Sequence, residues 1–115
     1  MAMDLEEFQL VLLRRPAVAA ELDDATADRL PAEHLAFYAG LRRTGEVVTN
    51  GPMRDQPDEA LRGMAIFTAG SLDQARQIAQ QDPLVRAGRL EIEAMIWWCP
   101  AGTMARPGRP FTLGG

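Results

Sequence analysis

His34 and Asp82 are the two residues whose types and spacing best suit acid–base chemistry. The chain has one histidine, and an imidazole is the side chain that gains and loses protons most readily near neutral pH. His34 lies on the apolar face of a predicted helix, so we expect the ring to face a sheet or a cavity beside it. The residues that share this face with helical spacing are Leu30, Phe37, Tyr38 and Leu41.

Asp82 is the candidate that would orient the imidazole. It directly precedes Pro83, where a short acidic side chain commonly closes a turn by accepting from backbone N–H groups, so a structural role is one interpretation. His34 also has a structural interpretation, as a core histidine that bonds to a backbone carbonyl. If the two side chains meet, the carboxylate fixes the tautomer of the ring and stabilises its protonated form. No serine or cysteine is assigned as a nucleophile beside them, which favours proton transfer over acyl transfer.

The candidate ligand-binding residues surround this pair in the predicted fold. Arg14 and Arg15 end the first predicted strand and would attract an anionic ligand, although an arginine at such a position is more often simply solvated. Two aromatic residues near His34 are expected to line a cleft, and a Gly-Pro pair marks a turn. The predicted ligand-binding residues are Arg14, Phe37, Tyr38, Gly51 and Pro52.

Four strands and two helices must position these side chains. Pro16 closes the first strand, Gly45 stops the first helix and Asp82-Pro83 ends the second. Within the first helix Pro31 is expected to start a new helical turn, and the segment 71–74 has the spacing of a capping box that opens the second helix. The predicted strands are residues 7–14, 46–50, 61–68 and 89–98, and the first predicted helix is residues 25–43.

The order strand-helix-strand-strand-helix-strand predicts an α+β fold of the ferredoxin-like type, a four-stranded antiparallel sheet with both helices on one face. The first strand carries apolar side chains on both sides, with Phe8, Leu10 and Leu12 on one side and Val11 and Leu13 on the other. Since the helices cover one face only, the second face needs another cover, and a second copy of the sheet is the simplest one. We therefore expect a homodimer formed through the sheet face.

The alternative cover for that face is the C-terminal tail. We expect one domain over residues 1–98 and a tail over residues 99–115 that is rich in proline and glycine. Phe111 and Leu113 would anchor such a tail, either on its own chain or on a partner.

Composition narrows the classes of partner. The 115 residues suffice for one domain, and 12 Lys and Arg against 16 Asp and Glu give a net charge of -4 with no basic field, so no nucleic acid is expected. No apolar run approaches the length that a bilayer requires, and the acidic start is unlike a signal peptide, so we expect a soluble cytoplasmic protein with no membrane partner. Cys99 is the one cysteine, which argues against a disulfide and a structural zinc site, and no metal or other cofactor is expected.

Several short motifs follow one another with an order and spacing that are more specific than any single motif. They are the strand end Leu12-Leu13-Arg14-Arg15-Pro16, the segment Pro31-Ala32-Glu33-His34-Leu35, Gly45, Gly51-Pro52, the segment Ser71-Leu72-Asp73-Gln74-Ala75-Arg76, and Asp82-Pro83 followed by Val85-Arg86-Ala87-Gly88. Together they resemble the YCII-related (YciI-like) family of the dimeric α+β barrel group, which also includes muconolactone isomerases. The resemblance covers roughly residues 6–98.

The resemblance implies a subunit that dimerises through its sheet, with a cleft in which His34 and Asp82 form a catalytic pair. Enzymatic relatives imply isomerisation or dehydrohalogenation of small lactones, with no cofactor. Two positions depart from the family pattern: Leu84 replaces an aromatic residue after Asp-Pro, and Ile96 replaces a proline that often precedes the final aromatic residue. These departures imply a pocket of different shape.

Several kinds of function compete for the same residues. An enzyme would use His34, oriented by Asp82, to move a proton on a small anionic or lactone-like substrate held near Arg14. A binding module would hold a metabolite in the same cleft without converting it, as a regulatory or accessory dimer. A structural module would use His34 for packing, and a heme protein would use it as an axial ligand.

Overall fold

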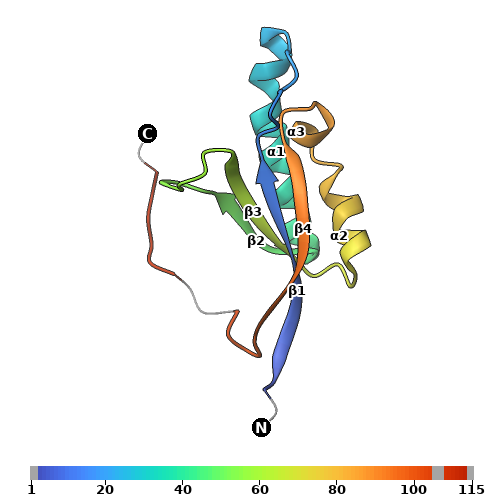
Figure 1. Ribbon diagram of the computed structural model, residues 1–115, viewed down its shortest axis with the longest axis vertical. Coiled ribbons are helices and arrows are strands. Elements are labelled where there is room, and N and C mark those ends of the chain that lie inside the picture. The colour runs from blue at the N-terminus through green and yellow to red at the C-terminus, as the bar shows by residue number, and fades with distance from the viewer. Residues whose placement is uncertain (1–2, 105–107, 114–115) are drawn as a thin grey trace.

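The computed structural model describes residues 3–104 and 108–113. In this part of the chain a strand precedes a long helix, a hairpin, two shorter helices and a final strand (Figure 1). The elements are β1 Leu5–Arg14, α1 Asp24–Thr44, β2 Val47–Pro52, β3 Leu61–Phe67, α2 Leu72–Ala79, α3 Pro83–Arg86 and β4 Glu91–Pro100.

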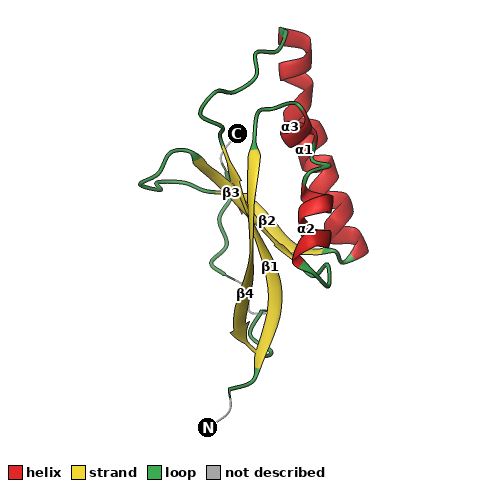
Figure 2. Cartoon of the chain, turned by 45° about the vertical axis from the view of Figure 1, so that its right-hand side comes forward, coloured by secondary structure: helices red, strands yellow, loops and turns green. Residues whose placement is uncertain are grey.

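The strands form one antiparallel sheet in the order β2-β3-β1-β4. β1 lies inside the sheet and pairs with β4 along its full length, from Leu5 opposite Pro100 to Arg14 opposite Glu91. The helices lie together on one face of the sheet (Figure 2). The structure therefore confirms the predicted ferredoxin-like α+β fold.

Helix α1 is bounded by the capping residues that its sequence supplies. The Asp23 carboxylate accepts a hydrogen bond from the Thr26 N–H at 3.3 Å, and Gly45 ends the helix with a φ of 85°, a left-handed conformation that glycine adopts at little cost. Pro31, which was expected to start a new helical turn, lies inside the continuous helix α1. Its fixed φ suits a helix, so the chain continues through it with the loss of one N–H donor.

The second helical segment is divided in two. α2 ends at Ala79, before the predicted end at Asp82-Pro83, and α3 begins at Pro83. A residue before proline is held out of the helical conformation, and Asp82 has an extended ψ of 127°. Asp82 therefore caps the start of a new helix, where the sequence had predicted it at the end of a longer one.

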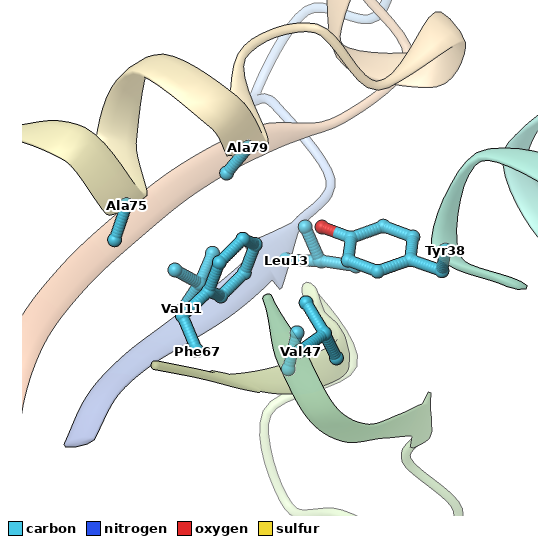
Figure 3. Close-up of a cluster of buried hydrophobic side chains, with 8 residues drawn as sticks. Val11, Leu13, Tyr38, Val47, Phe67, Ala75 and Ala79 are labelled. Atoms are coloured by element: carbon cyan, nitrogen blue, oxygen red, sulfur yellow. The ribbon is translucent and has the colours of Figure 1, made fainter. Parts of the chain in front are cut away.

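The main core lies between the helices and the sheet. Val11 and Leu13 of β1 point to this side, as their alternation predicts, and meet Tyr38 of α1 and Phe67 of β3 (Figure 3). Small residues of α2 complete the contact, because a helix packs close to a sheet only where its side chains are short. The buried cluster comprises Val11, Leu13, Tyr38, Val47, Ala65, Phe67, Ala75 and Ala79.

The opposite face of the sheet is also apolar and is only partly covered. Phe8, Ile66 and Cys99 form a small buried cluster there, which the tail residue Met104 contacts. β4 runs to Pro100, two residues past its predicted end, so Cys99 belongs to the sheet. Among the described tail residues, Phe111 and Leu113 are 77% and 63% exposed, so neither anchors the tail on its own chain, which was one of the two alternatives for these residues.

We expect the close approach of β2 and β3 to depend on Gly63. A Cβ built there would lie 2.9 Å from the backbone oxygen of Gly51, a contact that only a shift of β2 relieves. Gly63→Ala should lower the free energy of unfolding by about 1–3 kcal/mol in chemical denaturation. The matched control is Gly40→Ala inside α1, where the nearest atom, on the Arg43 side chain, is 3.7 Å away, and which should raise stability by about 0.5–1 kcal/mol. Equal stability of Gly63→Ala and the wild type would contradict this account.

Candidate active site

His34 and Asp82 meet between α1 and α3, although they lie 48 positions apart in the sequence. Nδ1 of His34 is 2.8 Å from Oδ2 of Asp82, a hydrogen-bonding distance. The Asp82 side chain is fully buried, whereas 17% of the His34 side chain is exposed. Because a carboxylate only accepts hydrogen bonds, this geometry assigns a proton to Nδ1 and leaves Nε2 for a ligand.

The local sequence fixes the carboxylate of Asp82 on its other side. As the N-cap of α3, Asp82 accepts a hydrogen bond from the Leu84 N–H through Oδ1 at 2.9 Å, so Oδ2 is left for His34. Pro83 occupies the start of the helix, where its missing N–H costs nothing. Both oxygens of this buried group are therefore bonded, and the capping interaction and the pairing with His34 coexist.

Tyr38 lies one helical turn after His34 and packs against the imidazole edge to face, with ring centroids 5.2 Å apart. Tyr38 is fully buried, and its hydroxyl has no hydrogen-bond partner among the described residues. Burial and, to a smaller extent, the negative charge of Asp82 raise the pKa of the Tyr38 hydroxyl far above its ordinary value. The phenol therefore stays neutral and supports the imidazole by packing.

The exposed part of His34 lines a cavity of about 900 Å³. This volume lies in the usual range for pockets that bind small molecules. The end of β1, the following loop, α1, the β2–β3 hairpin and the chain around α3 all contribute to the wall. Gly51 and Pro52 line it, so the structure brings these two predicted ligand-binding residues together with His34.

The other three predicted ligand-binding residues do not line this cavity. Arg14 points away from it because side chains alternate along β1, and it pairs with Glu93 at 3.1 Å and with Asp58. The Arg14 guanidinium holds the pKa of the Asp58 carboxyl below its ordinary value. Phe37 and Tyr38 pack into the main core instead.

Several residues of the cavity wall were not predicted. They are Asn50, Arg62 and Arg89, whereas Arg15, which was named beside Arg14 as a candidate for an anionic ligand, does line the cavity. Strand alternation around Leu13 could have separated Arg15 from Arg14, but nothing local in the sequence marks the other three. Leu84, which departs from the family pattern, also lines the cavity, so that position does affect its shape.

The fold, with a buried carboxylate–imidazole pair beside a small-molecule cavity, places the chain among ferredoxin-like α+β proteins. The model of the YCII-related domain matches residues 8–98, and the chain belongs to this family. No curated protein matches the chain significantly.

Two enzymes are among the solved structures that share the fold. One is 5-chloro-2-hydroxyhydroquinone dehydrochlorinase from Burkholderia phenoliruptrix AC1100 in complex with 2,5-dihydroxybenzoquinone, which is 20% identical over 78% of this chain and 92% of that chain, with a TM-score of 0.53. Another is muconolactone isomerase, which is 17% identical over 90% of this chain and 99% of that chain, with a TM-score of 0.61. At these identities the likeness shows the fold alone.

Two further features are absent from the described residues. No helix within residues 3–104 and 108–113 has the length and apolar character needed to cross a membrane. The same residues contain no group of three or more histidine, cysteine, aspartate or glutamate side chains that could hold a metal ion.

Tyr38 offers a direct spectroscopic test of this arrangement because it is the one tyrosine in the chain. Because its pKa is raised, the folded state favours the neutral phenol. The contribution of this group to the free energy of unfolding is therefore fully present below about pH 10, the ordinary tyrosine value, and falls as the pH rises above it. In an alkaline titration followed by ultraviolet absorbance, we expect phenolate to appear only as circular dichroism reports unfolding.

The control for this titration is the chain in denaturant, where Tyr38 should ionise near its ordinary value of about 10. Asp82→Asn removes a negative charge near the ring and should lower the pKa of Tyr38 in the folded protein. Phenolate that forms near pH 10 while the fold remains intact would contradict the buried placement of Tyr38.

Proposed function

We propose that the protein is an enzyme that needs no cofactor and moves a proton on a small anionic or lactone-like substrate. The observation that supports this most is the 2.8 Å contact between His34 Nδ1 and the fully buried Asp82, at the wall of a cavity that a small molecule can enter. His34 acts as the general base and acid through Nε2. Asp82 holds the ring in the tautomer that leaves Nε2 unprotonated, and it stabilises the imidazolium that forms when Nε2 accepts a proton.

For an isomerase, one base suffices. Nε2 removes a proton from a carbon next to a carbonyl, the electron pair of the broken C–H bond moves toward the carbonyl oxygen, and a double bond shifts. The imidazolium then returns the proton to another carbon of the conjugated system.

For a dehydrohalogenase, the same base removes a proton and the electron pair expels a halide from the substrate. The products are the unsaturated substrate, the halide and the protonated imidazole, so atoms and charges balance without an oxidant. Solved structures that share the fold include an isomerase and a dehydrochlorinase, which supports both reaction types equally.

A screen of small lactones and halogenated hydroquinones, first by thermal shift and then by product analysis, tests the proposed reaction. A ligand that binds the native state raises the melting temperature, and product analysis separates turnover from binding alone. We expect Asp82→Asn to lower kcat/KM about 10²–10⁴-fold, because an amide neither fixes the tautomer nor stabilises the imidazolium. Asparagine is also a good N-cap, so α3 should stay folded.

Asp73→Asn in the first turn of α2 is the matched control, since it makes the same substitution at a carboxylate that is 85% exposed. It should leave kcat/KM unchanged. His34→Ala should abolish turnover in a folded protein. If His34→Ala and Asp82→Asn lower stability and leave turnover as in the wild type, the pair is structural and the proposed function fails. A ligand that binds at His34 and is released unchanged would instead identify a metabolite-binding module.

We also propose that the protein is a homodimer in which the uncovered sheet faces pack together. The supporting observation is the apolar character of that face: Leu10 and Met64 surround the buried cluster of Phe8 and Ile66, and Trp97 is 38% exposed at its side. The ion pairs of Arg14 lie at the edge of this face, as polar groups do at the rim of an interface.

Sedimentation equilibrium tests the dimer. The wild type should sediment at twice the chain mass of 12.6 kDa, and Leu10→Glu should shift the population to monomer because it buries an unpaired charge at the interface. Val18→Glu is the control, since Val18 is 89% exposed on the loop after β1. A monomeric wild type, or an effect of Val18→Glu equal to that of Leu10→Glu, would contradict the proposed interface.

A further inference from the structure

Three arginines line the cavity that contains His34. They are Arg15, Arg62 and Arg89, and the one carboxylate among the described lining residues is Glu21. The cavity wall therefore carries two net positive charges in a chain whose net charge is -4. None of the three arginines forms an ion pair among the described residues, whereas Arg14 on the other face is paired with Asp58 and Glu93.

The three arginines stand at the same end of the sheet. Arg15 directly follows β1 and donates its backbone N–H to the carbonyl of Ala60 at 2.8 Å. Arg62 belongs to β3 and Arg89 precedes β4, and these two strands flank β1 on opposite sides. Neighbouring strands lie about 4.8 Å apart, so β3 and β4 are separated by roughly 10 Å, with β1 between them.

Arg62 owes its position to an irregularity in the pairing of β1 with β3. Leu13 lies opposite Gly63 and Arg14 lies opposite Leu61, so Arg62 is an extra residue of a β-bulge. Bulges turn a side chain from the direction that strand alternation gives it, and they are frequent beside functional sites. Among the described residues its guanidinium forms one hydrogen bond, a long one of 3.4 Å to the Glu59 carbonyl, which uses one of its five N–H donors.

A hydrogen bond to a backbone carbonyl holds Arg89 in place, and its guanidinium forms no ion pair with a carboxylate among the described residues. Its guanidinium donates to the carbonyl of Ala20 at 3.2 Å, and the Ala20 N–H donates to the carbonyl of Gly88 at 3.1 Å. These two bonds join the loop after β1 to the turn before β4. Of the five N–H groups of a guanidinium, four remain for a ligand, in a planar arrangement that suits a carboxylate.

We infer that the ligand of this cavity carries two anionic groups, one bound by Arg62 and the other by Arg89, with Arg15 between them. The inference rests on the proposed function only in taking the cavity at His34 as the ligand site. Two negative charges match the net charge of the wall, and the spacing of the flanking strands suits a molecule with its charges at opposite ends. The carbon skeleton between the charges then lies within reach of His34 on the same wall.

A matched pair of probes tests the number of charges. The trans,trans isomer of muconate and sorbate share the same six-carbon diene, but muconate has a carboxylate at both ends and sorbate at one end only. By titration calorimetry at low salt, we expect muconate to bind the wild type about ten-fold or more tightly than sorbate, since a charge-assisted hydrogen bond is worth at least that factor.

Substitutions then test whether Arg62 and Arg89 bind the two carboxylates of muconate. Arg62→Gln and Arg89→Gln should each weaken muconate binding about ten-fold or more and reduce its advantage over sorbate, whereas Arg86→Gln, an exposed arginine of α3 away from the cavity, should change neither affinity. Arg89→Lys keeps the charge and should retain part of the binding, which separates charge from loss of the loop contact. Circular dichroism verifies that each variant is folded.

Three outcomes would overturn the inference: equal binding of muconate and sorbate, an effect of Arg62→Gln and Arg89→Gln no larger than that of Arg86→Gln, or no binding of muconate to folded wild type at millimolar concentration. The proposed function fails separately. If muconate binds with the predicted arginine dependence, also to His34→Asn, and no screened compound is converted, the dianion site stands and the catalytic role of His34 does not.

Discussion

The buried carboxylate of Asp82 is the interaction on which the site depends. A carboxylate that is removed from water must have both oxygens bonded, and here one oxygen caps α3 while the other bonds to His34 on α1. The same group thus sets the start of one helix, joins it to another and selects the tautomer of the imidazole. Because the cap is local and the imidazole is distant in sequence, the pair forms only when both helices are docked on the sheet. Folding and assembly of the site are therefore one event.

Strand β1 has apolar side chains on both faces of the sheet. Val11 and Leu13 are buried under the helices, whereas Phe8 and Leu10 belong to the face that the helices leave uncovered. A strand that is apolar on both sides has no face toward solvent. If its pairing slipped by one residue, every side chain would move to the opposite face of the sheet and lose its packing partners. The same alternation decides which arginine at the end of β1 lines the cavity. Arg15 follows Leu13 with the same parity, and Arg14 is directed to the other side.

The sequence predicted the fold and the meeting of His34 with Asp82, because both follow from long-range order alone. The strand and helix order places the two helices on one face, and the helical phase of His34 and the proline after Asp82 give each side chain its direction. Predictions failed where the outcome depended on local geometry. The end of α2 at Ala79 and the insertion of Tyr38 into the core depend on packing at close range, which single-residue patterns do not encode.

The residues that line the cavity were the hardest to predict from the sequence, because their positions also depend on local geometry and on contacts between distant segments. Arg62 reaches it through a bulge, and Arg89 through contacts with a loop that is distant in sequence, so neither residue belongs to a recognisable motif. The cap of α3 positions Asp82, which would take part in the chemistry with His34. The arginines that would select the ligand, Arg62 and Arg89, lie on a β-bulge and beside a turn. A substitution at the wall, such as Leu84 in place of an aromatic residue, changes the shape of the pocket and leaves both bonds of the Asp82 side chain in place. The fold therefore allows the shape of the cavity to change while the contact between His34 and Asp82 stays the same.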